Sequence, residues 1–254
     1  METGISHLKR QAAERAVEFV ASGMVVGLGH GSTAIFALRR IAELLRSGKL
    51  EDILGVPCSS QVEADARALG LSLTTLEEHP VIDLTIDGAD EVTPDLDLIK
   101  GGGGALLREK IVAQASRREI IVVDETKVSP VLGTEWSVPV EVLPFGWRSQ
   151  AAYLESLRAE ISLRRDRYGA PFRTDQGNWI IDCDFGSIPY PTGLANELDR
   201  RAGIVAHGLF LGLATDVIVG GENGLEHWRR DSRRGSERAG IDDRVSGRRA
   251  RGGQ

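Results

Sequence analysis

The sequence predicts an α/β fold in which helices flank an open, mostly parallel β-sheet. Short apolar runs alternate with amphipathic segments along the first half of the chain, as in "DILGVP" followed by "SQVEADARALG". A helix over residues 104–118 likewise leads into the apolar run of "EIIVVD". Because strand–helix–strand units with right-handed crossovers build parallel sheets, we expect a Rossmann-like sheet with helices on its faces.

The first elements are predicted to be a helix, a strand and a second helix. Residues 5–21 place apolar side chains at helical spacing, at Leu8, Ala12, Ala16, Phe19 and Val20. The run "MVVGLG" predicts a buried strand at 24–28. In the helix that follows, Ser32 or Thr33 lies near the start and Gly48 at the exit, and these residue types commonly begin and end helices.

After Pro130 the pattern changes, which predicts a smaller α+β domain inserted into the first. The proline-containing stretch "TEWSVPVEVLPFGW" precedes a helix at about 148–160 and a strand near 161–164. A later apolar run, in "DVIVGG", could return to the first sheet. We therefore expect a large α/β domain of residues 1–130 plus 206–227, a small domain of 131–205, and a basic, disordered tail of 228–254.

The composition is ordinary for a globular protein of 254 residues, with 41% apolar and 27% charged residues. Apolar runs such as "IIVV" are too short to span a membrane, and the first 20 residues have no signal-peptide core, so we expect a cytoplasmic protein. Cys58 and Cys183 have no spacing typical of a metal site or a disulfide framework, and we interpret both as buried thiols.

Charge is unevenly distributed along the chain, whose net charge is −6. Residues 229–254 contain nine Arg against four acidic residues, which leaves 22 basic against 33 acidic residues before them. The tail could contact nucleic acid or an acidic partner, although a solvated tail without a specific role is favoured. The acidic body argues against nucleic acid as the main ligand.

Four predicted strands are followed by polar, glycine-rich or charged loops. The loops read "GHGST" after 24–28, "DGADE" after "VIDLTI", "KGGGG" after "LDLI", and "DETK" after "IIVV". Ligands of open parallel sheets bind at the carboxyl ends of the strands. All four loops should therefore meet on one edge and form one site.

The loop "GLGHGST" is better suited to a phosphate than to a dinucleotide. Gly27 and Gly29 match the first two glycines of G-x-G-x-x-G, but Ser32 stands at the third position. Glycine amides, a helix N-terminus and the hydroxyls of Ser32 and Thr33 together favour phosphate binding. The alternative is a tight turn capped by Ser32. Lys127 of "DETK" is a possible second phosphate ligand.

The acidic loop "DGADE" concentrates three carboxylates, on Asp87, Asp90 and Glu91. Carboxylates at this density repel one another unless a cation or hydrogen-bond donors separate them. Calcium is a poor candidate because the spacing does not fit a D-x-D-x-D-G loop, and Asx-type turns would explain the two aspartates without a ligand. Lys100 could supply the balancing positive charge.

Glu109 is a candidate general base. At about 100° per residue, Leu107, Ile111 and Ala115 form one helical stripe, and Glu109 falls roughly on the opposite side with Ala105 and Val112 as neighbours. A carboxylate partly removed from water beside a lysine can accept a proton near neutral pH. Taken alone, a helical glutamate is usually a plain surface charge.

The order and spacing of the motifs resemble type A ribose-5-phosphate isomerase. The similarity rests on "GLGHGSTA", "DGADEV", "KGGGGALLREKIVA", "VDETK" and "VPVEVLPF", with "TDQGNWIIDCDFG" and "GIVAHGLF" fitting later segments, and it covers about residues 5–225. It implies interconversion of ribose 5-phosphate and ribulose 5-phosphate in the pentose phosphate pathway, without cofactor or metal. It also implies a homodimer or homotetramer, with no nucleic-acid or membrane partner.

The resemblance also implies roles for individual residues. Glu109 would move the proton between C2 and C1, Asp87 would assist ring opening or hydroxyl proton transfer, and Asp90 with Lys100 would fix the sugar and stabilise the enediolate. The remaining substrate and phosphate contacts would come from Gly29, His30, Gly31, Ser32, Thr33, Gly88, Ala89, Gly101, Gly102, Lys127 and Lys9. His30 departs from the family pattern, which usually has Thr there, and it is bulkier and titrates near neutrality.

Two other functions remain possible from the residues alone. A sugar-phosphate sensor could use "GHGST" and Lys127 but would have no need of Glu109, Asp87 and Lys100 together. A nucleotide-dependent reductase would need an acid about 20 residues beyond the glycines. Glu51 and Asp52 lie near that spacing.

Overall fold

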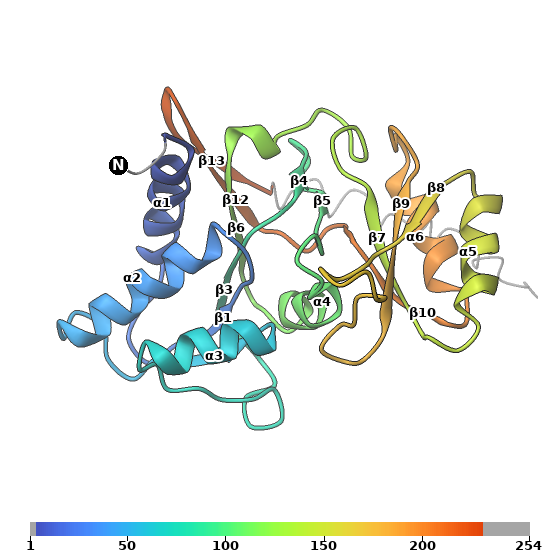
Figure 1. The fold of residues 1–254 in the computed structure, drawn as a ribbon. Helices are drawn as coiled ribbons and strands as arrows, with labels where there is room; N and C mark the ends of the chain where they lie inside the picture. The colour runs from blue at the N-terminus through green and yellow to red at the C-terminus, as the bar shows by residue number, and fades with distance from the viewer. Residues whose placement is uncertain (1–3, 231–254) are drawn as a thin grey trace, which may run out of the picture.

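The computed structural model describes residues 4–230, which form a large parallel sheet, a smaller antiparallel sheet and a short sheet between them (Figure 1). The large sheet has the order β13-β12-β6-β3-β1-β2. Its neighbours pair in parallel except β12 and β13, which are antiparallel. The strands are β1 (Val25–Leu28), β2 (Leu54–Pro57), β3 (Leu84–Asp87), β6 (Glu119–Asp124), β12 (Asp216–Gly221) and β13 (Gly224–Arg229). The predicted α/β class is therefore confirmed.

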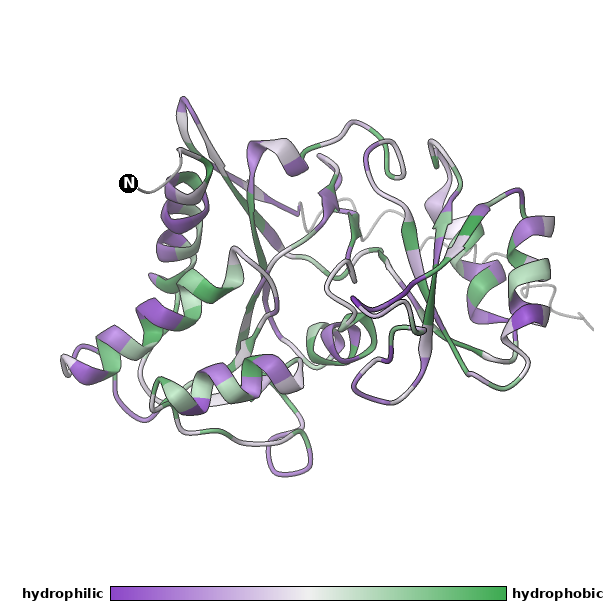
Figure 2. Ribbon diagram, viewed as in Figure 1, coloured by the Kyte–Doolittle hydropathy of each residue, from purple (hydrophilic) through white to green (hydrophobic). Residues whose placement is uncertain are grey.

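Helices cover both faces of the large sheet because its central strands are apolar on both sides. Ile120 and Val122 of β6 pack into the core formed with α1 (Gly4–Val17) and α2 (Ala34–Arg46). Ile121 and Val123 face the core that includes α4 (Leu106–Gln114). Helix α3 (Ser60–Ala68) packs beside β2. Figure 2 shows this arrangement as apolar strands inside and mixed helices outside.

The small sheet contains four antiparallel strands in the order β10-β7-β9-β8. Its elements are β7 (Val138–Val142), α5 (Trp147–Ser156), β8 (Glu160–Leu163), β9 (Trp179–Asp184), α6 (Pro191–Asp199) and β10 (Ile204–His207). This sheet accounts for the α+β character predicted after Pro130. The domain boundary predicted at 206 falls inside β10, because Ala206 and His207 pair with β7.

A three-stranded sheet connects the two larger ones. It consists of β4 (Glu91–Val92), β5 (Leu98–Ile99) and β11 (Leu209–Phe210), with β5 in the centre. The Lys100 amide, just after β5, donates to the carbonyl of Gly208, 2.9 Å away. The segment that carries Lys100 is therefore held from the small-sheet side.

Residues 228–230, which were predicted to start the disordered tail, belong to the folded part of the chain. Trp228 and Arg229 belong to β13, and the Arg230 amide donates to the carbonyl of Thr215. These residues are ordered because β13 pairs along the whole of β12. The prediction for 231–254 lies outside the described residues. Between residues 4 and 230, no helix has the length and apolarity needed to cross a bilayer.

The strand order places a topological switch point between β1 and β3. The chain runs from β1 through α2 to β2 on one side, and then returns through α3 to β3 on the other side of β1. Loops that leave such neighbouring strands diverge above the sheet edge and leave a crevice there. This crevice is where the predicted polar loops end.

Candidate active site

A cavity of about 380 Å³ at the carboxyl edge of the large sheet is lined by residues from all four predicted loops. Its lining residues are Lys9, His30, Gly31, Ser32, Thr33, Gly88, Ala89, Asp90, Lys100, Gly101, Gly102, Gly103, Glu109, Lys127 and Trp136. Two predicted residues are missing from this lining, since Asp87 is completely buried and Gly29 faces a separate pocket beside α2 and α3. Trp136 and Gly103 were not among the predicted residues.

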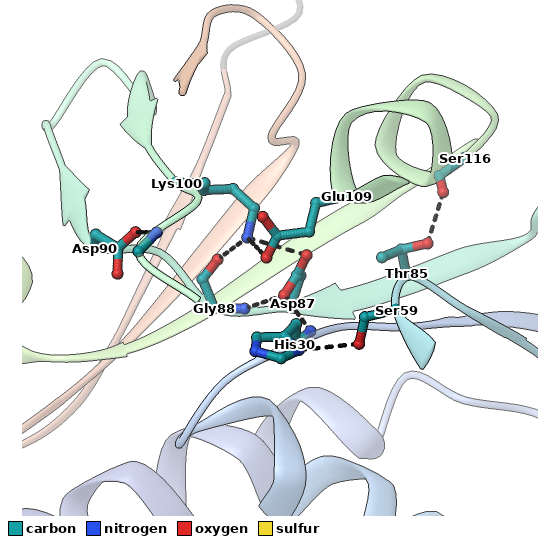
Figure 3. A network of polar contacts seen from close by, with 10 residues as sticks. His30, Ser59, Thr85, Asp87, Gly88, Asp90, Lys100, Glu109 and Ser116 are labelled. Carbon is teal, nitrogen blue, oxygen red and sulfur yellow. Dashed lines mark hydrogen bonds and ion pairs between the residues drawn. The ribbon is translucent and has the colours of Figure 1, made fainter. Parts of the chain in front are cut away.

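Lys100, Asp87 and Glu109 form a charge cluster (Figure 3), of which Lys100 and Glu109 line the cavity. The Lys100 ammonium lies 3.0 Å from Asp87 Oδ2 and 3.1 Å from Glu109 Oε1, and it donates to the carbonyl of Gly88. All three charged side chains are nearly or completely buried. Glu109 Oε2 has no hydrogen-bond partner within residues 4–230. One carboxylate oxygen of Glu109 is thus held by Lys100 and the other is free.

Burial and neighbouring charge set the protonation of this cluster. Burial raises the pKa of Glu109 to about 7, with Lys100 opposing the rise and Asp87 adding to it. Burial alone would lower the pKa of Lys100, but the two carboxylates outweigh it, so that pKa is raised and the ammonium stays charged. Glu109 can therefore both accept and release a proton near neutral pH, beside a permanent positive charge.

Asp87 is held from below the cavity by backbone amides. Its Oδ1 accepts hydrogen bonds from the amides of His30 (2.9 Å) and Gly88 (2.7 Å), while Oδ2 faces Lys100. Asp87 ends β3 and is fully covered. Its carboxylate therefore orients Lys100 and connects the loops after β1 and β3.

The predicted apolar face of α4 was wrong. Ile111 of the expected stripe is 43% exposed, whereas Leu106, Glu109 and Val112 are buried. The helix contacts β7 and β10 of the small sheet as well as packing over the large one, so its buried face is turned relative to the stripe. The expected position of Glu109 on a covered flank of the helix, with Ala105 and Val112 as neighbours, is confirmed.

Gly102 and Gly103 have no room for a side chain because side chains from other loops fill the space around them. A Cβ at Gly102 would lie 2.7 Å from Asp90 Oδ1, and one at Gly103 would lie 2.5 Å from His30 Nε2. Asp90 Oδ2 accepts the hydrogen bond of the Gly102 amide at 2.7 Å. The glycine loop therefore contacts the loops after β1 and β3 directly.

Lys9, Ser32 and Lys127 line the same cavity from elements other than the helix that carries Glu109. Lys9 Nζ donates to Ser32 Oγ at 3.0 Å and lies 3.7 Å from Asp124 Oδ2. Lys127 Nζ lies 4.6 Å from the centre of the Trp136 ring. Ser32 precedes the N-terminus of α2, so cations, a hydroxyl and helix amides meet here. Such an arrangement suits a phosphate.

His30 links the loop after β1 to the start of α3. Its Nδ1 lies 3.0 Å from Ser59 Oγ, and Ser59 Oγ accepts the Val62 amide as the N-cap of α3. Ser59 thus holds one ring nitrogen. The other, Nε2, is turned towards Gly103 at the cavity.

Hydrogen-bond donors separate the carboxylates of the acidic loop. Glu91 is fully buried and accepts from the amides of Gly133 (2.9 Å) and Thr134 (3.2 Å). Its role is structural, and with Asp87 and Asp90 already bonded to amides the loop has no set of carboxylates free for calcium. The acid expected for nucleotide binding also lies elsewhere. The Glu51 amide bonds Ser22 Oγ at the amino edge of the sheet, which argues against the reductase alternative.

A metal could find ligand atoms on Cys58, Asp87 and Glu109, which lie within 4.8 Å of one another. However, the Lys100 ammonium already faces both carboxylates. Burial raises the pKa of the Cys58 thiol well above its usual range, so the sulfur is a neutral thiol. The two carboxylates of this donor set are therefore paired with an ammonium rather than arranged around a metal ion.

The chain is similar to known proteins over most of its length. Residues 54–224 match the family Ribose 5-phosphate isomerase A (phosphoriboisomerase A). Ribose-5-phosphate isomerase A of Desulfatibacillum aliphaticivorans is 56% identical over 86% of this chain and 95% of its own length. The protein of the same name from Chloroflexus aurantiacus is 58% identical, over 86% and 92%.

Solved structures agree with the sequence relatives. A D-ribose-5-phosphate isomerase in complex with phospho-erythronic acid superposes with a TM-score of 0.88 at 37% identity, covering 90% of this chain and 100% of its own. Ribose 5-phosphate isomerase from Plasmodium falciparum gives a TM-score of 0.85 at 39% identity, over 88% and 98%. Nearly the whole of each related structure is thus matched by this chain.

Proposed function

The chain belongs to the ribose 5-phosphate isomerase A family and interconverts ribose 5-phosphate and ribulose 5-phosphate, and we propose that Glu109 carries the proton between C1 and C2 of the sugar. The observation that supports this role is the buried Lys100–Glu109 pair in the cavity lining, 3.1 Å apart, with one Glu109 oxygen free. A sugar-phosphate sensor would have no use for such a pair. The reaction belongs to the pentose phosphate pathway.

The cavity lining supports one orientation of the substrate. Lys9, Ser32 and Lys127 bind the phosphate, since they offer two cations and a hydroxyl, with Ser32 just before the start of α2. Thr33, which also lines the cavity, adds a second hydroxyl. The open-chain sugar then extends along the glycine loop, and its C1 and C2 reach Glu109.

Proton transfer proceeds through an enediolate. Glu109 accepts the proton from C2, the C2–H electron pair forms the C1–C2 double bond, and the former aldehyde oxygen takes the negative charge. The hydroxyl proton on O2 then passes to O1, leaving the charge on O2. Glu109 returns its proton to C1 as C2 becomes a ketone. The carboxylate ends as it began, so no other reactant is consumed.

Lys100 and the backbone amides of the glycine loop stabilise the enediolate oxygens. A fixed ammonium and fixed N–H groups in a site shielded from water stabilise developing negative charge without reorganising. Asp87 acts through Lys100, because its carboxylate is covered and faces the ammonium. This differs from the direct sugar contact expected from the resemblance. Asp90 likewise acts on the glycine loop through the Gly102 amide.

Assembly and location follow the family as proposals. We infer a homodimer or homotetramer in the cytoplasm, with a sugar phosphate as the ligand and neither nucleic acid nor membrane as a partner. Light scattering coupled to size exclusion would test the oligomeric state, and a monomer at micromolar concentration would contradict it.

Isomerisation in D₂O tests the proton transfer. While the proton rests on Glu109 it can exchange with solvent, so ribulose 5-phosphate should carry deuterium at C1 in part of the product. Mass spectrometry of the product after a single turnover measures that fraction. Product entirely free of deuterium would instead favour a hydride shift or a base fully shielded from solvent, and Glu109→Gln would then distinguish the two.

A further inference from the structure

The glycine loop is held from outside the cavity by Arg164, a residue of the small sheet. Arg164 Nη1 donates to the carbonyls of Gly101 at 2.8 Å and Gly102 at 3.1 Å. Arg164 directly follows β8, more than 60 residues along the chain from the loop it contacts. Through this guanidinium the small sheet contacts the glycine loop of the substrate site.

Arg164 is itself fixed at its other nitrogens. Its Nε donates to Asp182 Oδ2 at 2.9 Å and its Nη2 donates to Asp182 Oδ1, which makes a bidentate pair on the neighbouring strand β9. The Phe172 ring, which would clash with a Cβ at Gly104, lies 5.9 Å from the guanidinium carbon. A planar guanidinium held on one side presents its remaining N–H groups in one defined direction.

Peptide geometry carries this restraint into the cavity. In a trans peptide the carbonyl and the following N–H point to opposite sides. Because the Gly102 carbonyl faces Arg164, the Gly103 N–H faces away from Arg164, and Gly103 lines the cavity. The Gly102 amide is taken by Asp90, whereas the Gly103 amide has no acceptor within the described residues. Arg164 therefore leaves one free backbone donor at the substrate side.

We propose that Arg164 is a positioning residue for catalysis, which fixes the Gly101–Gly103 peptides so that the Gly103 N–H can donate to the enediolate. This inference rests on the proposed function of the site. A run of four glycines has unusually wide conformational freedom, and donors must be fixed before the reaction to stabilise charge without reorganisation. Arg164 supplies that restraint without touching the substrate.

The effect is geometric rather than electrostatic. Asp182 neutralises the guanidinium, and Arg164 is absent from the residues that line the cavity. A lysine at this position would keep the positive charge. It could not hold Asp182 in a bidentate pair and two carbonyls at the same time.

The test compares Arg164→Lys with the control Arg165→Lys. Arg165 is the adjacent, exposed residue, and it donates to the carbonyl of Gly169 on its own hairpin, away from the cavity. For each variant, kcat and KM are measured together with the dissociation constants of phospho-erythronic acid and of inorganic phosphate. The planar carboxylate of phospho-erythronic acid carries delocalised negative charge, as the enediolate does, whereas inorganic phosphate probes only the proposed phosphate-binding residues.

Arg164→Lys should lower kcat by about 10- to 100-fold, the range expected for a small misplacement of a catalytic group. Affinity for phospho-erythronic acid should fall by a similar factor, while inorganic phosphate binding and the Arg165→Lys control stay within about twofold of the unmodified enzyme. Amide hydrogen exchange should speed up at 101–104 and stay unchanged along α4.

Two results would overturn the proposal. One is a folded Arg164→Lys enzyme with unchanged kcat. The other is an equal loss of affinity for inorganic phosphate and phospho-erythronic acid, which would show a general structural defect. Failure here is separable from failure of the proposed function, because Glu109→Gln tests that function without altering the hydrogen bonds of Arg164.

Discussion

The raised pKa of Glu109 should appear as the acid limb of the pH profile of kcat/KM. The base must be ionised in the free enzyme, and burial raises its pKa to about 7. With that value, about one enzyme in 100 carries the ionised carboxylate at pH 5 and about half do at pH 7. A glutamate with the ordinary pKa of about 4.3 would lose only about a fifth of its ionised form between pH 7 and pH 5.

Initial rates at low substrate from pH 5 to 8.5, with ribulose 5-phosphate detected directly, measure this limb. We expect log kcat/KM to rise with a slope of 1 up to about pH 7 and then level. The substrate phosphate also titrates, near 6, so the inhibition constant of inorganic phosphate must be followed over the same range. A flat profile between pH 5 and 8 would refute the assignment of a buried, raised carboxyl as the base.

Lys100→Met sharpens the same test. The Lys100 charge opposes the rise of the Glu109 pKa, so removing it should move the acid limb above 7 while lowering kcat. The direction of the movement is the diagnostic quantity. If the apparent pKa of the acid limb stays in place or moves below 7, the titrating group is not beside Lys100.

Three further predictions concern phosphate binding, the pH dependence of stability, and the C-terminal residues. Ser32→Ala and Lys127→Ala should raise KM about tenfold with little change in kcat, because a phosphate held equally in ground and transition states contributes uniform binding. Steady-state kinetics would contradict this if kcat fell at unchanged KM. Burial and the nearby Lys110 charge lower the pKa of His207 to about 4. Between pH 4 and 6.5 the unfolded chain therefore binds more protons at His207 than the folded chain does. The free energy of unfolding should therefore fall by roughly 3 kcal/mol as pH drops through that window. Urea titrations should show a smaller fall for His207→Gln, and an equal fall would contradict the assignment. Deleting residues 231–254 should leave kcat within about twofold of the full chain, because β13 remains. A deletion variant that aggregates or loses activity would show that these residues contribute to the fold.

The large sheet and its polar edge could be predicted because their signals are local. Apolar runs of four to six residues mark buried strands, and the residues after each run fall at the same edge of a parallel sheet. His30, Ser32 and Lys127 line one cavity for this reason. The segment "LDLI" was expected to be another such strand, but β5 belongs to the antiparallel three-stranded sheet, and Lys100 reaches the cavity from there.

Contacts made by the small sheet could not be predicted, because they depend on packing between distant segments. Arg164 lies in a charged stretch, "LRRDR", in which nothing distinguishes it from Arg165. Trp136 reaches the cavity from a loop after Lys127, and no local pattern indicates it. The face of α4 was mispredicted for the same reason, because α4 packs against two sheets and its buried side includes Glu109.

The exchange of Glu109 for glutamine tests the account most directly, with Glu119→Gln as its control. Glu119 is also a buried glutamate near Lys100; burial raises its pKa well above the usual range, and it does not line the cavity. Glu109→Gln keeps the shape of the side chain but cannot accept the C2 proton. It should lower kcat by about 10² to 10⁴ while phospho-erythronic acid still binds, and Glu119→Gln should retain most of the native kcat. A Glu109→Gln enzyme with more than about a tenth of native kcat would contradict the account.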